Sequence, residues 1–320
     1  MRFSSIFKII ILNIFISKMA HSAVCEERYP PDSEECQYVQ ELEQKAEQGD
    51  ESAQFALGSW YAEGRYVKPD YKLAIKWLEK AGKQGSDFSY FILGYHYNYG
   101  ENFPLSRQKA LEWCRRAAAQ GLAEAQDAIG VMFMQGEGVS QDYQQALAWY
   151  RKAARQGLPA AQTHLGIMSA FGRGVAQSDR QAIAWYRKAA KQDFAKAQYQ
   201  LGVAYSTGRG VPENSRNALK WYLKAAEQGF APAQSALGEI YAHGRQGVPK
   251  DNKQAYIWYY MASIYTRKSK DDSLALIAER DRLKGTLTPD QLSETYAAFD
   301  LIRRKINQSK EAKKIARKKY

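Results

Sequence analysis

The chain has 320 residues, of which 45% are hydrophobic, and a formal charge of +12. This composition is normal for a globular chain. The charge lies at the two ends: residues 1–23 carry three basic side chains and no acid, and the last twenty residues carry nine basic side chains against one acid, a net of +8. Residues 24–300 are left with 12 − 3 − 8 = +1, so the high pI gives no evidence that the body of the protein binds nucleic acid.

Residues 1–23 have the layout of a secretory signal peptide. Arg2 and Lys8 precede an apolar run at 9–16, and small residues follow before Val24. The run is too short to span a bilayer. We therefore expect a cleaved signal and an exported protein, with the periplasm favoured and secretion as the alternative.

Two of the three cysteines lie in the leader that follows, within residues 24–49. Cys25 and Cys36 could close a small disulfide loop in an oxidising compartment. A lipid-anchored form cut before Cys25 is disfavoured, because Val24 is a poor residue at that position. Residues 37–49 predict a cap helix, the degenerate first copy that repeat arrays commonly carry.

The central region, residues 50–266, repeats itself with a period of 36 residues. The period is seen in the pairs of leucine or isoleucine with glycine that begin at Leu57, Leu93, Ile129, Leu165, Leu201 and Leu237. A unit of this length has room for two helices and two turns. The sequence predicts six such units.

Both helices of a unit are marked by their ends. The first helix begins near Pro159, where a missing N–H costs nothing, and ends at Gly172. Asp142, Ser178 and Asp251 each precede a glutamine by three residues, which is the spacing of a capping box that opens the second helix. Glycine, as at Gly157, closes it.

Each predicted helix has one apolar stripe. In the first helix Ala161, Leu165 and Ser169 lie four apart. The stripe of the second helix contains alanines and tryptophan: Ala146, Trp149, Ala153 and Ala154. Neither helix can bury its stripe alone, so each pair must stack on the next.

The repeated words resemble a known family. Ala-x-Ala-Gln, Leu-Gly-x-x-Tyr, Gly-x-Gly-Val, Ala-x-x-Trp-Tyr, Lys-Ala-Ala and Gln-Gly resemble the Sel-one-like repeat, a relative of the tetratricopeptide repeat. The resemblance implies an all-α fold, a right-handed α-solenoid of six 36-residue helix-turn-helix repeats with capping helices at both ends. It also implies a protein-binding scaffold.

The repeat register fades after residue 266. Residues 271–284 and 288–305 predict two longer helices within a C-terminal capping segment, 267–306. Residues 307–320 form a basic tail. This tail could make weak contact with an anionic surface, although a solvated helix end is the more ordinary reading.

The resemblance places the first helices along the inner curve of the solenoid, so their faces opposite the buried leucine predict a partner-binding groove for another protein or an extended peptide. Aromatic and methionine side chains on such a face favour binding. The alternative is that some of them pack sideways on neighbouring first helices. The predicted groove residues are Phe55, Phe88, Phe91, Tyr95, Asp127, Met134, Thr163, Ile167, Tyr199, Val203 and Glu239.

The sequence gives little support for catalysis, a cofactor or a metal. The four histidines have no zinc-site spacing. Ser106 and Lys109 form a Ser-x-x-Lys, but Ser106 stands at a helix-capping position and the partner motifs of penicillin-recognising enzymes are missing. Cys114 replaces a tyrosine of the other copies and predicts a small buried apolar residue.

The favoured function is therefore an exported scaffold for protein–protein interactions in the cell envelope. The alternative, taken from relatives of the repeat, is a periplasmic immunity protein that neutralises a secreted lipase toxin. A remote alternative is the β-lactam-binding or hydrolysing activity of cysteine-rich relatives, which carry a cysteine pair per repeat that this chain lacks. The predicted partner is a toxin or an envelope protein, with no specific nucleic acid.

Overall fold

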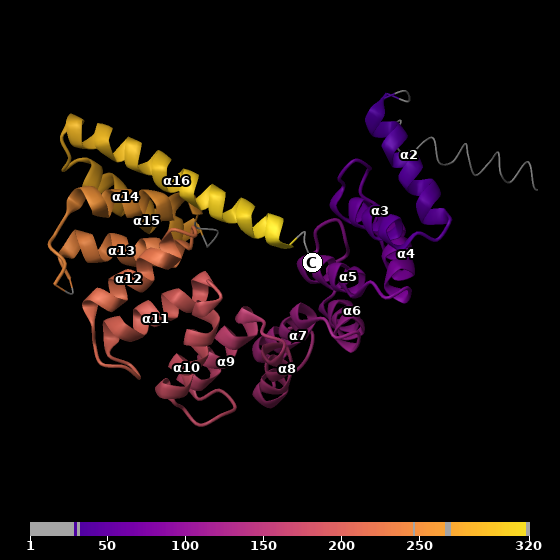
Figure 1. Cartoon of the computed structure of the whole chain (residues 1–320), viewed down its shortest axis with the longest axis horizontal. Helices are drawn as coiled ribbons and strands as arrows, with labels where there is room; N and C mark the ends of the chain where they lie inside the picture. Colours follow the sequence, from indigo (N-terminus) through magenta and orange to yellow (C-terminus); the bar gives the residue numbers. More distant parts are fainter. Residues whose placement is uncertain (1–28, 31–32, 246, 266–269, 318–320) are drawn as a thin grey trace, which may run out of the picture. The chain divides into compact units, whose positions relative to one another are not determined.

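The computed structural model describes residues 29–30, 33–245, 247–265 and 270–317. Every regular element among these residues is an α-helix (Figure 1). The chain divides into two compact units, Met1–Gln156 and Gly157–Tyr320, although the repeat pattern runs through this boundary without a break. Within each unit, consecutive helices of the repeats pack side by side.

The first unit contains a cap helix and three helix pairs: α2 (Glu34–Glu47), α3 (Glu51–Glu63), α4 (Tyr71–Lys83), α5 (Asp87–Tyr99), α6 (Arg107–Ala119), α7 (Ala123–Gln135) and α8 (Tyr143–Arg155). The second contains three pairs and two further helices: α9 (Pro159–Phe171), α10 (Asp179–Lys191), α11 (Ala195–Thr207), α12 (Ser215–Ala226), α13 (Ala231–His243), α14 (Asn252–Tyr265), α15 (Lys270–Lys284) and α16 (Pro289–Arg317). The predicted six repeats are therefore present as six helix pairs.

The predicted helix ends are confirmed. Gly172 ends α9 in the left-handed region, with φ of 65°. The Asp142 side chain accepts hydrogen bonds from the backbone N–H groups of Gln144 and Gln145, and Ser178 caps α10 in the same way. The caps satisfy N–H groups that have no partner inside the helix, so the same residue types recur at the same place in each unit.

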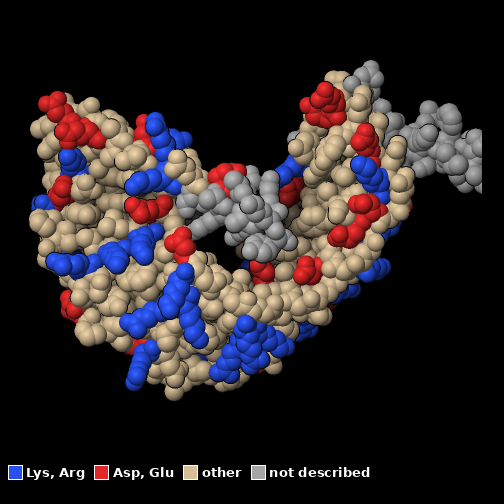
Figure 2. Space-filling view, viewed as in Figure 1, with Lys and Arg blue, Asp and Glu red and all other residues tan. Residues whose placement is uncertain are grey.

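In four of the six pairs, the glycine of the Leu-Gly pair provides space for a tyrosine ring from the second helix. A Cβ atom on Gly202 would lie 2.6 Å from the ring of Tyr222, and Gly130 stands in the same relation to Tyr150. The tyrosine is therefore the large buried residue of the second helix. Trp149, predicted for the buried stripe, lies only half-buried at its edge, with Lys152 Nζ 4.2 Å from the ring centroid. Basic side chains are exposed on both units (Figure 2).

A glutamine after the second helix of a pair bonds to the first helix of the same pair and to the turn before that helix. Gln192 Nε2 donates to the Gly157 carbonyl at 2.8 Å and to Gln162 Oε1 at 3.0 Å. Gln156 makes the same two bonds in the first unit, to Gly121 and Gln126. These bonds join the two helices of a pair and the turn that enters it, which explains why Ala-Gln and Gln-Gly recur together.

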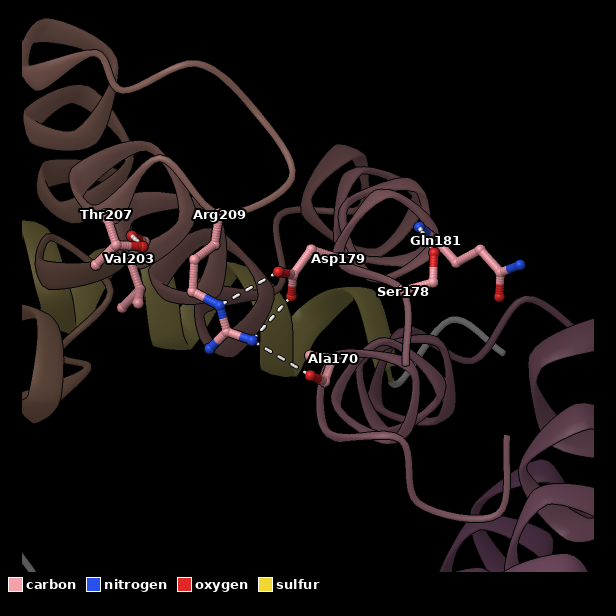
Figure 3. Close-up of polar contacts among 7 residues, drawn as sticks. All are labelled: Ala170, Ser178, Asp179, Gln181, Val203, Thr207 and Arg209. Atoms are coloured by element: carbon pink, nitrogen blue, oxygen red, sulfur yellow. Dashed lines mark hydrogen bonds and ion pairs between the residues drawn. The ribbon is translucent and has the colours of Figure 1, made fainter. Parts of the chain in front are cut away.

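The Gly-x-Gly-Val loop rests on the preceding pair. Gly210 has φ of 71°, and a Cβ atom there would lie 2.7 Å from the backbone of Asp179 at the start of α10. Arg209 reaches the same residue: its Nη2 donates to Asp179 Oδ1 at 2.9 Å and to the Ala170 carbonyl at 3.3 Å (Figure 3). In the first unit Glu137 and Arg107 form the corresponding ion pair with the charges exchanged. Such exposed pairs contribute less than about 1 kcal/mol, so the glycine fixes the loop more firmly than the charges do.

The ends of the array differ in detail from the prediction. Helix α2 begins at Glu34, where Ser33 accepts a hydrogen bond from the Cys36 N–H, three residues before the predicted start. Helix α16 continues to Arg317, so most of the predicted tail 307–320 is part of this helix. The capping box that opens α16 is confirmed by reciprocal bonds between Thr288 and Gln291. Among the described helices, none combines the length and apolarity needed to cross a bilayer.

The leader cysteine that the structure describes is buried. Cys36 is disulfide-bonded, whereas Cys114 is free. Cys25, the predicted partner of Cys36, lies outside the described residues, as do the predicted signal peptide 1–23 and residues 24–28, 31 and 32 of the leader.

Candidate partner-binding surface

In the first unit the predicted groove residues occupy two different faces of their helices. Phe88 and Tyr95 of α5 are 44% and 47% exposed. Phe91 is half-buried against the core, with its ring 5.8 Å from that of Phe88. The remaining predicted residues of this unit, Phe55, Asp127 and Met134, are also half-buried. Only α5 therefore brings an aromatic pair to the surface.

The second unit corrects part of the prediction. Thr163 is buried, and its hydroxyl donates to the Pro159 carbonyl of its own helix, so it cannot line an open groove. Tyr199 packs sideways, with its ring 5.8 Å from Tyr222 and 5.5 Å from Phe230. The contact with Phe230, at the start of the neighbouring first helix α13, is the sideways packing that the sequence left open, whereas Tyr222 belongs to the second helix α12.

The other three predicted residues of the second unit share one register position. Ile167 and Val203 are half-buried and Glu239 is exposed. All three correspond, at steps of 36 residues, to Tyr95 in the first unit. That position is therefore the face of the first helix that reaches solvent, and it is aromatic only in α5.

The prediction missed the last residue of the first helix. Tyr99 is 62% exposed and its ring lies 4.6 Å from that of Tyr95. Phe171 occupies the same position in α9 and is also exposed. A search one turn beyond Tyr95 and Ile167, up to the glycine that ends each helix, would have found both residues. Phe88, Tyr95 and Tyr99 together are called the α5 surface below.

A cavity of about 210 Å³ lies beside the α5 surface. It is bounded by α5, α6, α7 and the start of the loop after α7, and it is lined by Phe91, Gly94, Tyr95, Asn98, Tyr99, Cys114, Ala128, Val131, Met132 and Glu137. Most of these groups are apolar. The cavity brings together Phe91 and Tyr95, both predicted from sequence, with Tyr99, which was not.

The cavity has a cause in the sequence. Cys114 stands where Tyr150, Tyr186 and Tyr222 fill the space above the glycine of the Leu-Gly pair in other copies. Cysteine is much smaller than tyrosine, so its side chain leaves space beside Gly94. Cys114 is buried as predicted, and burial raises the pKa of its thiol to about 12. The protonated thiol is a poor nucleophile, and it lines the cavity as a small apolar group.

His96 is buried and packs against Tyr95 of the α5 surface. Its ring stacks on Phe103 at 5.0 Å and meets the edge of Tyr95 at 5.6 Å, and its Nδ1 lies 3.3 Å from the Glu101 carbonyl oxygen. Burial lowers the pKa of His96, and this effect exceeds the opposing effects of the Glu101 carbonyl and of the Glu63 and Glu101 carboxylates. The folded chain therefore resists protonation of this imidazole more than the unfolded chain does.

We expect this histidine to make the first unit sensitive to mild acid. Below the ordinary histidine pKa of 6.5 the unfolded chain binds a proton that folded His96 resists, so the free energy of unfolding falls as the pH falls. Urea denaturation between pH 7 and pH 5.5 should show a smaller loss for His96→Gln than for the wild type. His243→Gln, which removes an exposed imidazole, is the matched control. Equal slopes for His96→Gln and the wild type would contradict the expectation.

Chemistry other than binding finds little support in the described residues. Ser106 Oγ accepts a hydrogen bond from the Lys109 N–H as the N-cap of α6, which is a structural role. The described part of the chain contains no group of three His, Cys, Asp or Glu side chains arranged to hold a metal ion. The surface and its adjoining cavity are suited to non-covalent association.

The arrangement of stacked helix pairs defines a class, the helical repeat proteins. Six matches to the Sel1 repeat cover residues 51–86, 88–122, 123–158, 159–194, 195–230 and 231–263. The chain belongs to the Sel1 repeat family. A comparison with curated proteins finds no similar sequence.

Solved structures give the same assignment. The chain is similar to c5321, a protective antigen present in uropathogenic Escherichia coli strains that displays an SLR fold, at 34% identity and a TM-score of 0.68 over 85% of this chain. It spans only 57% of the length of that protein. A Sel1 repeat protein from Oxalobacter formigenes is 36% identical, with a TM-score of 0.63 over 68% of this chain and 89% of the other.

The immunity protein Pa5087 from Pseudomonas aeruginosa is a more distant match. It is 21% identical, with a TM-score of 0.49 over 67% of this chain and 81% of the other. A likeness this low does not transfer a function.

Proposed function

We propose that the chain is an exported scaffold that binds another protein through the α5 surface. Stacked helical repeats present extended surfaces that serve in binding. The observation that supports this site is the cavity of about 210 Å³ beside three exposed aromatic side chains. Exposed aromatic rings around a pocket are the usual centres of binding energy at protein interfaces.

The geometry indicates how the partner is held. Phe88, Tyr95 and Tyr99 offer flat rings whose burial removes a large apolar area from water. The cavity accepts one aromatic or branched aliphatic side chain, which would occupy the space that tyrosine takes in other repeats. Asn98 and Glu137, which also line the cavity, provide polar groups that can orient the partner. The partner therefore needs an apolar anchor residue on its surface to enter the cavity.

The test uses one variant that removes the rings and another that fills the cavity. Affinity capture from the envelope fraction identifies the partner, and titration calorimetry with the purified partner measures its Kd. Tyr95→Ala with Tyr99→Ala is expected to weaken binding by more than about tenfold, the loss expected for a hot spot. Cys114→Tyr should do the same, because it introduces the ring found in four of the other repeats and fills the cavity.

The control for both variants is Phe171→Ala, which removes an exposed ring from the second unit. It should bind as the wild type does. Circular dichroism should show that Cys114→Tyr remains folded. If both the ring and the cavity variants kept wild-type affinity for the purified partner, the α5 surface would not be the binding site.

The identity of the captured protein separates the two roles considered for the scaffold. A stoichiometric complex that inhibits a secreted lipase would make the chain an immunity protein. An envelope protein that keeps its activity in the complex would make it a structural scaffold. Export rests on the layout of residues 1–23, and N-terminal sequencing of protein from the periplasmic fraction tests it: a first residue between Ala20 and Cys25 is expected.

A further inference from the structure

Three aromatic rings meet on the surface at the start of the repeat array. The ring of Trp60 lies 5.6 Å from that of Tyr38 and 4.6 Å from that of Tyr66. Tyr38 is 55% exposed and Tyr66 36% exposed. Tyr38, Trp60 and Tyr66 are called the N-terminal aromatic cluster below. It lies on α2, α3 and the loop after α3, away from the α5 surface.

Tyr66 occupies a position that is glycine in most other copies. Steps of 36 residues carry it to Gly138, Gly174 and Gly210, all with positive φ, and Tyr66 itself has φ of 63°. A tyrosine rarely adopts this conformation, since its Cβ crowds the backbone. Here the preceding element is the cap helix α2 rather than a full pair. The Tyr66 ring packs on Trp60, so glycine at this position would remove one wall of the cluster without backbone strain.

Acidic side chains surround the cluster. Glu34, Glu35 and Glu41 line a shallow hollow of about 430 Å³ together with Gln37, Tyr38 and Tyr66, and none of the described residues that line it is basic. Glu34 and Glu35 also lie in the first turn of α2, where the helix dipole favours them. Glu41 lies beyond the first turn of α2, so the helix dipole does not account for its position in the hollow. Figure 2 shows acidic side chains over the region of α2.

The two ends of the chain have opposite charge. Residues 24–51 carry ten acidic side chains against two basic ones, a net charge of −8. Residues 301–320 carry nine basic side chains against one acidic, a net charge of +8. Residues 52–300 between them carry a net charge of 1 + 8 = +9 over a much longer stretch, so opposite charge is most concentrated in the acidic and basic end segments.

We propose that the N-terminal aromatic cluster and its acidic rim bind the basic segment 303–319 of a second copy of the chain. Lysine and arginine side chains fit such a surface in two ways. Their cationic heads lie over the faces of Trp60 and the tyrosines, and the carboxylates around the rings supply the counter-charge. The contact joins unlike surfaces of two copies, so it is heterologous and can extend from one copy to the next.

Sedimentation velocity of the purified full chain tests the proposal. Association that grows with protein concentration in about 50 mM salt, and is lost in about 0.5 M salt, is expected because screening weakens contacts between exposed charges. Tyr66→Gly and Glu41→Lys should each weaken this association by about tenfold or more. A loss of association in Tyr66→Gly would report the loss of the ring, because glycine adopts the positive φ of this position without strain and should not destabilise the fold. Phe171→Ala, which removes an exposed ring from α9, is the control and should associate normally.

Charge exchange separates this contact from general attraction. Lys313→Glu with Lys314→Glu should weaken association, and mixing that variant with Glu41→Lys should restore it in part, since the reversed charges then face each other. A synthetic peptide of residues 301–320 should dissociate the wild-type assembly. A chain that stays monomeric at low salt, or an assembly that is insensitive to Tyr66→Gly and to the peptide, would overturn the proposal. Neither result would bear on the α5 surface.

Discussion

Gly210→Ala is expected to destabilise the second unit by about 2–5 kcal/mol. One part of this cost comes from φ of 71°, which alanine adopts only with strain. The other comes from the new Cβ, which would lie 2.7 Å from backbone atoms of Asp179, where no flexible side chain can move aside. The loop would have to lift from α10, and the interface between the two helix pairs would loosen.

Gly247→Ala is the matched control for this prediction. Gly247 has φ of 70°, in the corresponding loop of the next repeat, and a Cβ there would meet nothing within 4 Å. The control should show the strain alone, about 1–2 kcal/mol. Urea denaturation of the full chain, followed by circular dichroism, compares the two. If the two variants proved equally stable, the close contact with Asp179 would not limit the loop.

Phe299→Ala is expected to release α16 from the second unit and to cost about 3–5 kcal/mol, the range for large-to-small changes in a core. Phe299 is buried, and its ring stacks on that of Tyr260 at a centroid distance of 4.1 Å. It also lies 5.7 Å from the ring of Tyr256. These contacts fix α16 on α14, so their loss opens the C-terminal end of the unit.

Hydrogen exchange measures this release residue by residue. Amides of α16 should lose protection in Phe299→Ala, while those of α9 and α10 should keep it, because repeat interfaces stabilise only their neighbours. Leu301→Ala, which removes an exposed side chain from the same helix, is the control. Wild-type protection of α16 in Phe299→Ala would show that other contacts hold the helix.

Much of the fold could be predicted because it depends on local rules repeated many times. The side chains of Asp142 and Ser178 accept hydrogen bonds from the first N–H groups of their helices, and Gly172 ends its helix at a positive φ. The same residue types recur at a period of 36 residues, which supports each of these predictions. The predicted ends of the cap helix and of α16 were less accurate, because each of these helices occurs only once and no repetition supports its boundaries. The boundary between the two units at Gln156 has no counterpart in the repeat pattern.

The candidate site was only partly predictable. A projection at 100° per residue from Leu165 treats the helix as if it stood alone, so it placed Thr163 on an open face and missed Phe171 one turn further on. The cavity was not foreseen, although Cys114 was recognised both as buried and as a replacement for tyrosine. The sequence does not give the volume of the space beside Cys114, because that volume depends on how far the neighbouring helices move to fill the space left by a smaller residue.

The last described helix has a consequence for biosynthesis. Ile306 packs on Gly229, 77 positions earlier, whereas the glutamine and loop contacts of the repeats join residues about 30 to 40 positions apart. Successive repeats can therefore pair as they leave the ribosome, each soon after its predecessor. The apolar edge of α14 that Phe299 covers stays open until α16 has been made. A nascent chain stalled before residue 299 would expose that edge, and it is there that we expect a holding chaperone to bind.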